Sequence, residues 1–129
     1  MDWQKDINVI VLKGLVLKSL EVNKYNNVMS LTTEDDKQFI FLHHQDCCES
    51  VSIYDTKGDV ESIIDSPILN IEEIIDCQNW PEDVPVPEYR DSYTWTTYII
   101  TTKKGSYTIR WLGESNGYYS ESVSFQIVS

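Results

Sequence analysis

The densest run of residues that could do chemistry is the segment 43–49, with the sequence HHQDCCE. Six of its seven residues are of types that bind metals in proteins. Side chains alternate along an extended chain, so His44, Asp46 and Cys48 would share one face. A catalytic zinc uses three protein ligands and a water, and the run therefore predicts a zinc site as one alternative. Its candidate ligands are His43, Asp46, Cys47 and Cys48.

The same run offers a thiol nucleophile as a second alternative. Cys47 or Cys48 lies beside a histidine that could act as its base. The acidic neighbours Asp46 and Glu49 oppose thiolate formation, because a nearby negative charge raises the pKa of a thiol. The ligand spacing also matches no standard metal site. We therefore expect a structural turn without cofactor or catalysis, and keep the zinc site and the thiol enzyme as alternatives.

The cysteines and the chain start indicate the compartment. The three cysteines are an odd number, and two of them are adjacent, so we expect reduced thiols in a reducing compartment. The first six residues, MDWQKD, lack the basic segment of a secretory signal. No apolar run approaches the ~20 residues of a membrane helix. We expect a soluble protein of the host-cell cytoplasm that does not bind membranes.

The negative charge is concentrated in the middle of the chain. The formal net charge is −11, and residues 34–91 hold sixteen acidic against three basic residues. Such a segment repels nucleic acid and attracts basic surfaces. Lys103, Lys104 and Arg110 lie near aromatic residues, but three cations among 21 acids do not favour direct nucleic-acid binding. The expected partner is a basic protein surface, for example a host nuclease or another nucleic-acid-binding protein.

The 129 residues predict a single domain, residues 1–129. Short apolar–polar alternation predicts strands over 15–22, 28–33, 38–44, 51–54, 68–75, 93–102, 106–112 and 118–128. The segment before residue 15 is a further strand candidate, and Asp59 can cap a short helix through Ile64. The predicted class is α+β: mainly antiparallel sheet, a meander of about seven to eight strands, with one or two short helices.

A long irregular segment and an excess of aromatic residues point to a binding surface. Three of the four prolines fall within residues 76–91, and long loops of this kind are often functional. The C-terminal third has more Tyr and Trp than one buried sheet face needs, so some rings should be exposed for contact. The candidate partner-binding residues are Glu34, Asp35, Asp36, Asp55, Asp59, Glu61, Glu72, Glu73, Trp95, Trp111, Tyr118 and Tyr119.

Two sequence strings resemble a family of small uncharacterised proteins of phages, prophages and bacterial mobile elements. The first string is HxQDCCExVxIxD over residues 43–55, and the second is GSxTIRWxGESNGYYSESV over residues 105–123. The first departs from the family pattern at His44, where the resemblance implies Glu, and this weakens His44 as a metal ligand. The resemblance implies an accessory role in a phage or mobile element and transfers no activity or site residue.

Three functions follow from these observations. The favoured one is a non-catalytic acidic binding protein, for example an inhibitor that occupies the basic surface of a host defence nuclease, of anti-CRISPR or anti-restriction type. The second is a small structural or accessory phage protein whose acidic segment is only a solvated surface. The third is a metal-dependent or thiol enzyme centred on residues 43–49.

Overall fold

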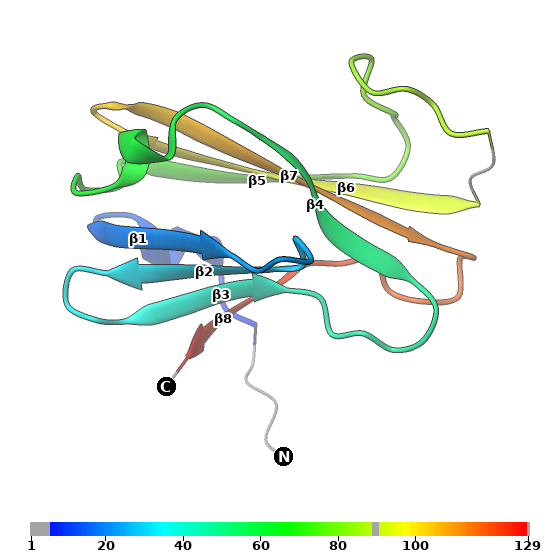
Figure 1. The fold of residues 1–129 in the computed structure, drawn as a ribbon, viewed down its shortest axis with the longest axis horizontal. Helices are drawn as coiled ribbons and strands as arrows, with labels where there is room; N and C mark the ends of the chain where they lie inside the picture. Colours follow the sequence, from blue (N-terminus) through cyan, green and yellow to red (C-terminus); the bar gives the residue numbers. More distant parts are fainter. Residues whose placement is uncertain (1–5, 89–90, 129) are drawn as a thin grey trace.

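The chain forms a sandwich of two antiparallel sheets. The structure, a computed structural model, describes residues 6–88 and 91–128. Its eight strands divide into two four-stranded sheets with the orders β1-β2-β3-β8 and β4-β7-β6-β5. Figure 1 shows the two sheets as separate layers, one above the other. This arrangement confirms the predicted class of mainly antiparallel sheet with about eight strands.

Each sheet combines segments from distant parts of the sequence. The first sheet contains β1 (Leu17–Val22), β2 (Val28–Thr33), β3 (Gln38–Leu42) and β8 (Ser124–Val128). The second contains β4 (Ser50–Lys57), β5 (Asn70–Asp76), β6 (Ser92–Thr102) and β7 (Gly105–Ser115).

The core lies between the layers and is built by alternating residues. Phe39 and Phe41 of β3 point inward, and the Phe41 ring contacts the Tyr98 ring of β6 with 4.6 Å between centroids. Ile109 and Trp111 of β7 are fully buried in the same cluster. Burial of such side chains stabilises the fold by about 1.5–3 kcal/mol each. The period-two pattern of the sequence therefore identified the strand faces that form the core.

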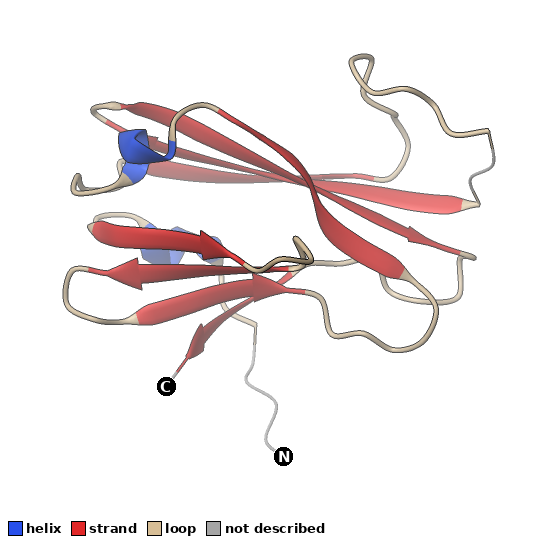
Figure 2. Cartoon of the chain, in the orientation of Figure 1, coloured by secondary structure: helices blue, strands red, loops and turns tan. Residues whose placement is uncertain are grey.

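The helical content is limited to two single turns. Both are 3-10 helices, η1 (Val9–Leu12) and η2 (Val60–Ile63), and the described residues contain no α-helix (Figure 2). The predicted cap is confirmed, since the Asp59 side chain accepts a hydrogen bond from the Glu61 N–H. The segment before residue 15 is the turn η1, not a strand. Among the described residues, no helix is long and apolar enough to cross a membrane.

The single predicted meander is wrong in two places. After β3 the chain crosses to the second sheet, where β4 pairs with β7. After β7 it crosses back, and β8 pairs with β3 in the first sheet. The predicted strand 118–128 is only Ser124–Val128, because the chain between Gly117 and Glu121 is held outside the ladder by side-chain hydrogen bonds. Alternation specifies which residues face inward, but it does not specify which strand lies beside which.

Candidate functional site

His43 and Glu49 form a buried pair at one end of the sandwich. Their side chains are 4% and 0% exposed, and His43 Nε2 lies 2.6 Å from Glu49 Oε2. The other ring nitrogen, Nδ1, lies 2.7 Å from the backbone oxygen of Ser122. Both ring nitrogens therefore face oxygens that can accept hydrogen bonds. The pair ties the segment after β3 to the segment before β8.

Glu49 also organises the loop around it. Its carboxylate accepts hydrogen bonds from the backbone N–H groups of Asp46 and Cys47, each at 2.9 Å. The contact with His43, followed by the Cys47 and Asp46 N–H groups, lowers the pKa of Glu49 to about 2. The residue with the most contacts in the HHQDCCE run is thus its glutamate, which stabilises the turn.

The structure does not bring the four proposed metal ligands together. His43 is engaged by Glu49 and Ser122, and Asp46 is exposed. A disulfide joins Cys47 to Cys48, whose Cα atoms lie 3.7 Å apart, so the predicted reduced state of these two thiols is wrong. No group of three His, Cys, Asp or Glu residues within 6–88 and 91–128 could hold a metal ion.

The loop after β7, which belongs to the second sequence string, lies at the same end of the sandwich as His43 and Glu49. Glu121 is buried and accepts a hydrogen bond of 2.7 Å from Thr94 Oγ1 and another from the Ser115 hydroxyl. Gly113 makes this approach possible, since a Cβ there would lie 2.6 Å from the Glu121 backbone oxygen. Glu49 of the first string and Glu121 of the second therefore both fasten the loops of this end.

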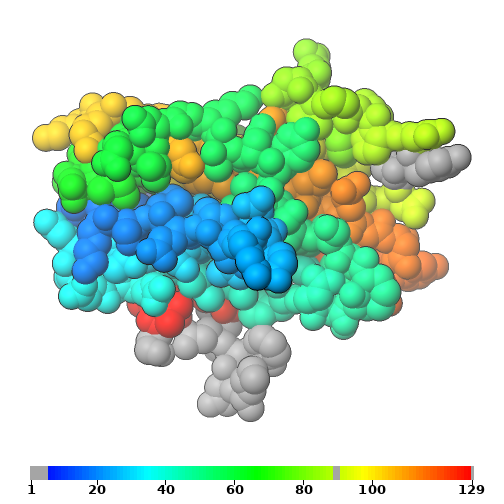
Figure 3. All heavy atoms as spheres, in the orientation of Figure 1, coloured from blue at the N-terminus to red at the C-terminus, as the bar shows by residue number. Residues whose placement is uncertain are grey.

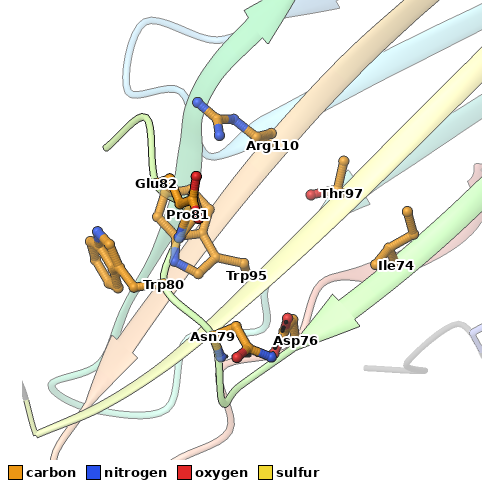
Figure 4. A pocket seen from close by; sticks show the side chains of 9 residues that line it. All are labelled: Ile74, Asp76, Asn79, Trp80, Pro81, Glu82, Trp95, Thr97 and Arg110. Atoms are coloured by element: carbon orange, nitrogen blue, oxygen red, sulfur yellow. Dashed lines mark hydrogen bonds between the residues drawn. The ribbon is translucent and has the colours of Figure 1, made fainter. Parts of the chain in front are cut away.

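A pocket of about 440 Å³ lies on the outer face of the second sheet. Its floor comes from β5, β6 and β7, and its wall comes from the loop after β5, residues 77–88, which we call the β5–β6 loop (Figure 4). In the space-filling view this loop, coloured yellow-green, forms the upper right of the molecule (Figure 3). The residues that line this loop pocket are Ile74, Asp76, Asn79, Trp80, Pro81, Glu82, Trp95, Thr97 and Arg110.

The strand register places the floor of the pocket in one row. Ile74 of β5 is opposite Thr97 of β6, Thr97 is opposite Arg110 of β7, and Arg110 is opposite Asp55 of β4. A bulge between Ile53 and Asp55 inserts one extra residue into β4. The bulge shifts the alternation by one position, so that Asp55 faces outward although Ile53 is buried.

Arg110 makes the central contacts of this row, and two carboxylates already balance its positive charge. Its guanidinium binds Asp55 through two hydrogen bonds of 2.7 and 2.6 Å, and it binds Asp83 of the β5–β6 loop through two of 3.0 Å. Arg110, with help from Lys57, lowers the pKa of Asp83 to about 2, while Asp55 and Asp83 raise the pKa of Arg110. The double pair holds the loop against the sheet.

Aromatic rings complete the site. Trp95 is 3% exposed, and its ring contacts those of Tyr54 and Trp80 at centroid distances of 5.2 Å each. The Arg110 guanidinium lies 5.6 Å from the Trp95 ring, within the range of a cation–π interaction. Tyr93 packs edge-on against Trp80 at 5.1 Å. The rings fix the β5–β6 loop and give the pocket an apolar side.

The proposed partner-binding residues divide between two ends of the sandwich and the core. The turn of Glu34, Asp35 and Asp36 and the turn of Asp59 and Glu61 lie at one end, on the left in Figure 1. Asp35 and Asp36 pair there with lysines. The acids of the middle segment therefore do not form one patch, because those of the two turns lie at this end and Asp76 and Glu82 lie at the separate loop pocket.

The remaining predicted contacts have mixed outcomes. Glu72 and Glu73 are exposed on β5, and Tyr118 is 88% exposed at the tip of the loop after β7. Trp95 and Trp111 are buried, so the expected exposure of these two rings is wrong. Trp111 fills the core, and Trp95 is covered by the β5–β6 loop, which local alternation could not foresee. Tyr119 is half-buried.

Sequence reasoning missed most of the pocket-lining residues. Asp76, Trp80 and Glu82 were included only as part of the proline-rich segment, and Arg110 was considered only as a nucleic-acid contact. The alternation of side chains along β7 indicates the position of Arg110. This residue stands between Ile109 and Trp111, whose side chains point to the core, so alternation places Arg110 on the outer face.

The fold and the site define a β-sandwich domain with an aromatic, carboxylate-bearing pocket on one outer face. The chain belongs to the family described as Domain of unknown function (DUF7448), whose model matches residues 13–125. The match includes both sequence strings. The resemblance to an uncharacterised family is thereby confirmed. No curated protein and no solved structure matches the chain.

Proposed function

We propose that the protein is a non-catalytic binding module that recognises a basic protein surface through the loop pocket. The supporting observation is the charge of the lining. Asp76 and Glu82 contribute carboxylates, while the one cation of the lining, Arg110, is paired with Asp55 and Asp83. Within the part of the chain that the structure describes, neither Asp76 nor Glu82 forms an ion pair, so the lining suits the side chain of an arginine or lysine.

The charge state of Asp76 supports this assignment. Its carboxylate accepts hydrogen bonds from the backbone N–H groups of Gln78 and Asn79 at 2.9 and 3.0 Å. These bonds lower the pKa of Asp76, so the group is negative throughout the physiological range. Glu82 is exposed at the rim. A cationic side chain of the partner would contact the Asp76 carboxylate, which is held by its hydrogen bonds, and the exposed Glu82 carboxylate.

Binding is favoured over catalysis because the reactive-looking residues have structural contacts. His43 and Glu49 satisfy each other and fasten the loops, and Cys47 and Cys48 are bonded together. The setting that we propose is a phage or mobile element acting in the host cytoplasm. The target would be the basic nucleic-acid channel of a host defence nuclease, which a negative domain could occupy.

The test is capture of partners from host lysate by immobilised protein in three forms. The wild type is compared with the pocket variant Asp76→Asn/Glu82→Gln and with a control variant, Glu61→Gln/Asp65→Asn, which removes the same charge at the other end. We expect the wild type and the control to retain the same basic protein, and the pocket variant to bind it about 10-fold more weakly.

Salt provides a second readout on the purified partner. Affinity should fall steeply between about 0.05 M and about 0.5 M salt, because exposed charges are screened beyond the Debye length. The proposal is wrong if the retained partner is acidic. It is equally wrong if the pocket variant binds as the control does.

A further inference from the structure

Strand β5 is contacted by η1, but among the described residues its outer edge has no backbone hydrogen-bond partner. The outer edges of the other three edge strands are partly covered. Leu17 of β1 bridges to Ile64, the Ile53 N–H of β4 donates to the Asn26 oxygen, and the Ile7 N–H donates to the Phe125 oxygen of β8. Within residues 6–88 and 91–128, β5 has no backbone hydrogen bond other than those of its ladder with β6. Its outward N–H and C=O groups can therefore accept another strand.

The side chains of this edge combine apolar and acidic groups. Glu72, Glu73, Ile74 and Ile75 are four consecutive exposed residues, and the two isoleucines are 49% and 63% exposed. Ile74 faces the loop pocket with Asp76, and Ile75 faces the opposite side of the sheet. Apolar surface is thus exposed on both faces of the strand at the same point.

The flanking charges oppose pairing with a second copy of this chain. In an antiparallel pair of two β5 strands centred on Ile74, Glu72 would lie opposite Asp76 of the copy. In the pair centred on Glu73, the two Glu73 side chains would lie opposite each other, and in the pair centred on Ile75 the two Asp76 carboxylates would be diagonal neighbours. Like charges directly opposite each other destabilise a strand pair. The same carboxylates favour pairing of β5 with an extended segment that carries basic side chains.

We propose that an extended basic segment of a partner protein adds to the free edge of β5 as a fifth strand of the second sheet. This inference rests on the proposed function and names its mode of binding. An antiparallel segment opposite residues 76 to 72 would read basic, apolar, apolar, basic, basic. Its first basic side chain lies at the mouth of the loop pocket, because Asp76 lines that pocket and belongs to β5.

The probe is a fluorescent peptide with the core Lys-Val-Val-Lys-Lys, titrated onto the whole protein by polarisation. Two further peptides have the same sequence with N-methyl groups on alternating residues, one on the odd and one on the even positions. In an added strand, only one of these two sets points its N–H groups toward β5. We expect one methylated peptide to lose binding and the other to bind like the parent.

Protein variants localise the contact. Ile75→Lys on the β5 edge should weaken the parent peptide by about 10-fold, since it replaces an apolar contact by a like charge. Val128→Lys on β8, where the native residue is 40% exposed, is the matched control and should leave the affinity within about twofold. Slowed hydrogen exchange at amides of residues 70–76 would show the added strand directly.

The outcomes separate the two proposals. Equal binding of both methylated peptides, with binding still lost in Asp76→Asn/Glu82→Gln, overturns strand addition and leaves the basic-partner proposal intact. The alternating methylation pattern in a protein whose pocket variant binds normally supports strand addition, but it contradicts the pocket and the placement of the first basic side chain opposite Asp76. No binding of the parent peptide, or loss of binding with both methylated sets, overturns strand addition.

Discussion

Replacing Arg110 tests how the β5–β6 loop is held. The Arg110 side chain is 10% exposed, and its partners Asp55 and Asp83 are 33% and 51% exposed. Arg110→Met keeps most of the apolar stem but leaves two carboxylates facing each other. Removing one partner of a fully buried pair costs about 3–5 kcal/mol, and an exposed pair contributes about 0–1 kcal/mol. For this half-exposed cluster we expect a loss of about 2.5 kcal/mol in the free energy of unfolding.

The assay is urea unfolding followed by tryptophan fluorescence, which reports on the Trp95 and Trp80 rings beside the guanidinium. A loss of this size corresponds to a fall of about 10 °C in Tm for a domain of this length. The control is Lys57→Met. Lys57 binds the same carboxylate, that of Asp83, at 3.1 Å, but its side chain is 57% exposed. We expect the control to change the free energy by no more than about 0.5 kcal/mol.

The pH dependence provides an independent check. Arg110 lowers the pKa of Asp83 in the folded protein to about 2, from an ordinary value of 3.8. The stabilisation is therefore present above about pH 4 and is lost as the pH falls toward about 2. Part of this acid loss should be missing in Arg110→Met. The reasoning is refuted if Arg110→Met and Lys57→Met destabilise equally, since burial would then not decide the strength of the pair.

Three further predictions concern other contacts. Gly113→Ala should destabilise the protein by about 1–3 kcal/mol in urea unfolding, because the new Cβ would lie too close to the Glu121 backbone oxygen. An unchanged urea midpoint would show that the two segments can move apart without loss of stability. Glu49→Gln should flatten the stability profile between about pH 4.5 and about pH 2, the window set by the lowered pKa of Glu49 beside His43; a profile identical to wild type in calorimetry would contradict that pair. Burial raises the pKa of Tyr98 far above its ordinary value of 10, so stability should fall above pH 10. Urea unfolding should show a weaker alkaline fall in Tyr98→Phe, and an equal fall in both proteins would contradict this origin.

The outward-facing residues show where prediction from the sequence stops. The alternation of side chains along β7 places Arg110 on the outer face. Its main partner Asp55 lies two residues after the buried Ile53, so the same alternation would place Asp55 on the inner face. Only the bulge reverses that expectation, and a bulge depends on the partner strand. The Asp83 contact depends on how the β5–β6 loop folds back, and no periodic pattern encodes that path.

The sequence by itself determined the class of fold, most strand positions and the faces that form the core, because side chains alternate along a strand and apolar faces must be buried. It also located the acidic segment and the proline-rich loop. The tertiary structure decided which strands are neighbours, which carboxylates are neutralised and which rings are covered. Those outcomes depend on contacts between residues far apart in the chain, such as Arg110 with Asp55 and His43 with Ser122. Local pattern carries no information about such pairs, so the loop pocket and the open edge of β5 became visible only in the folded molecule.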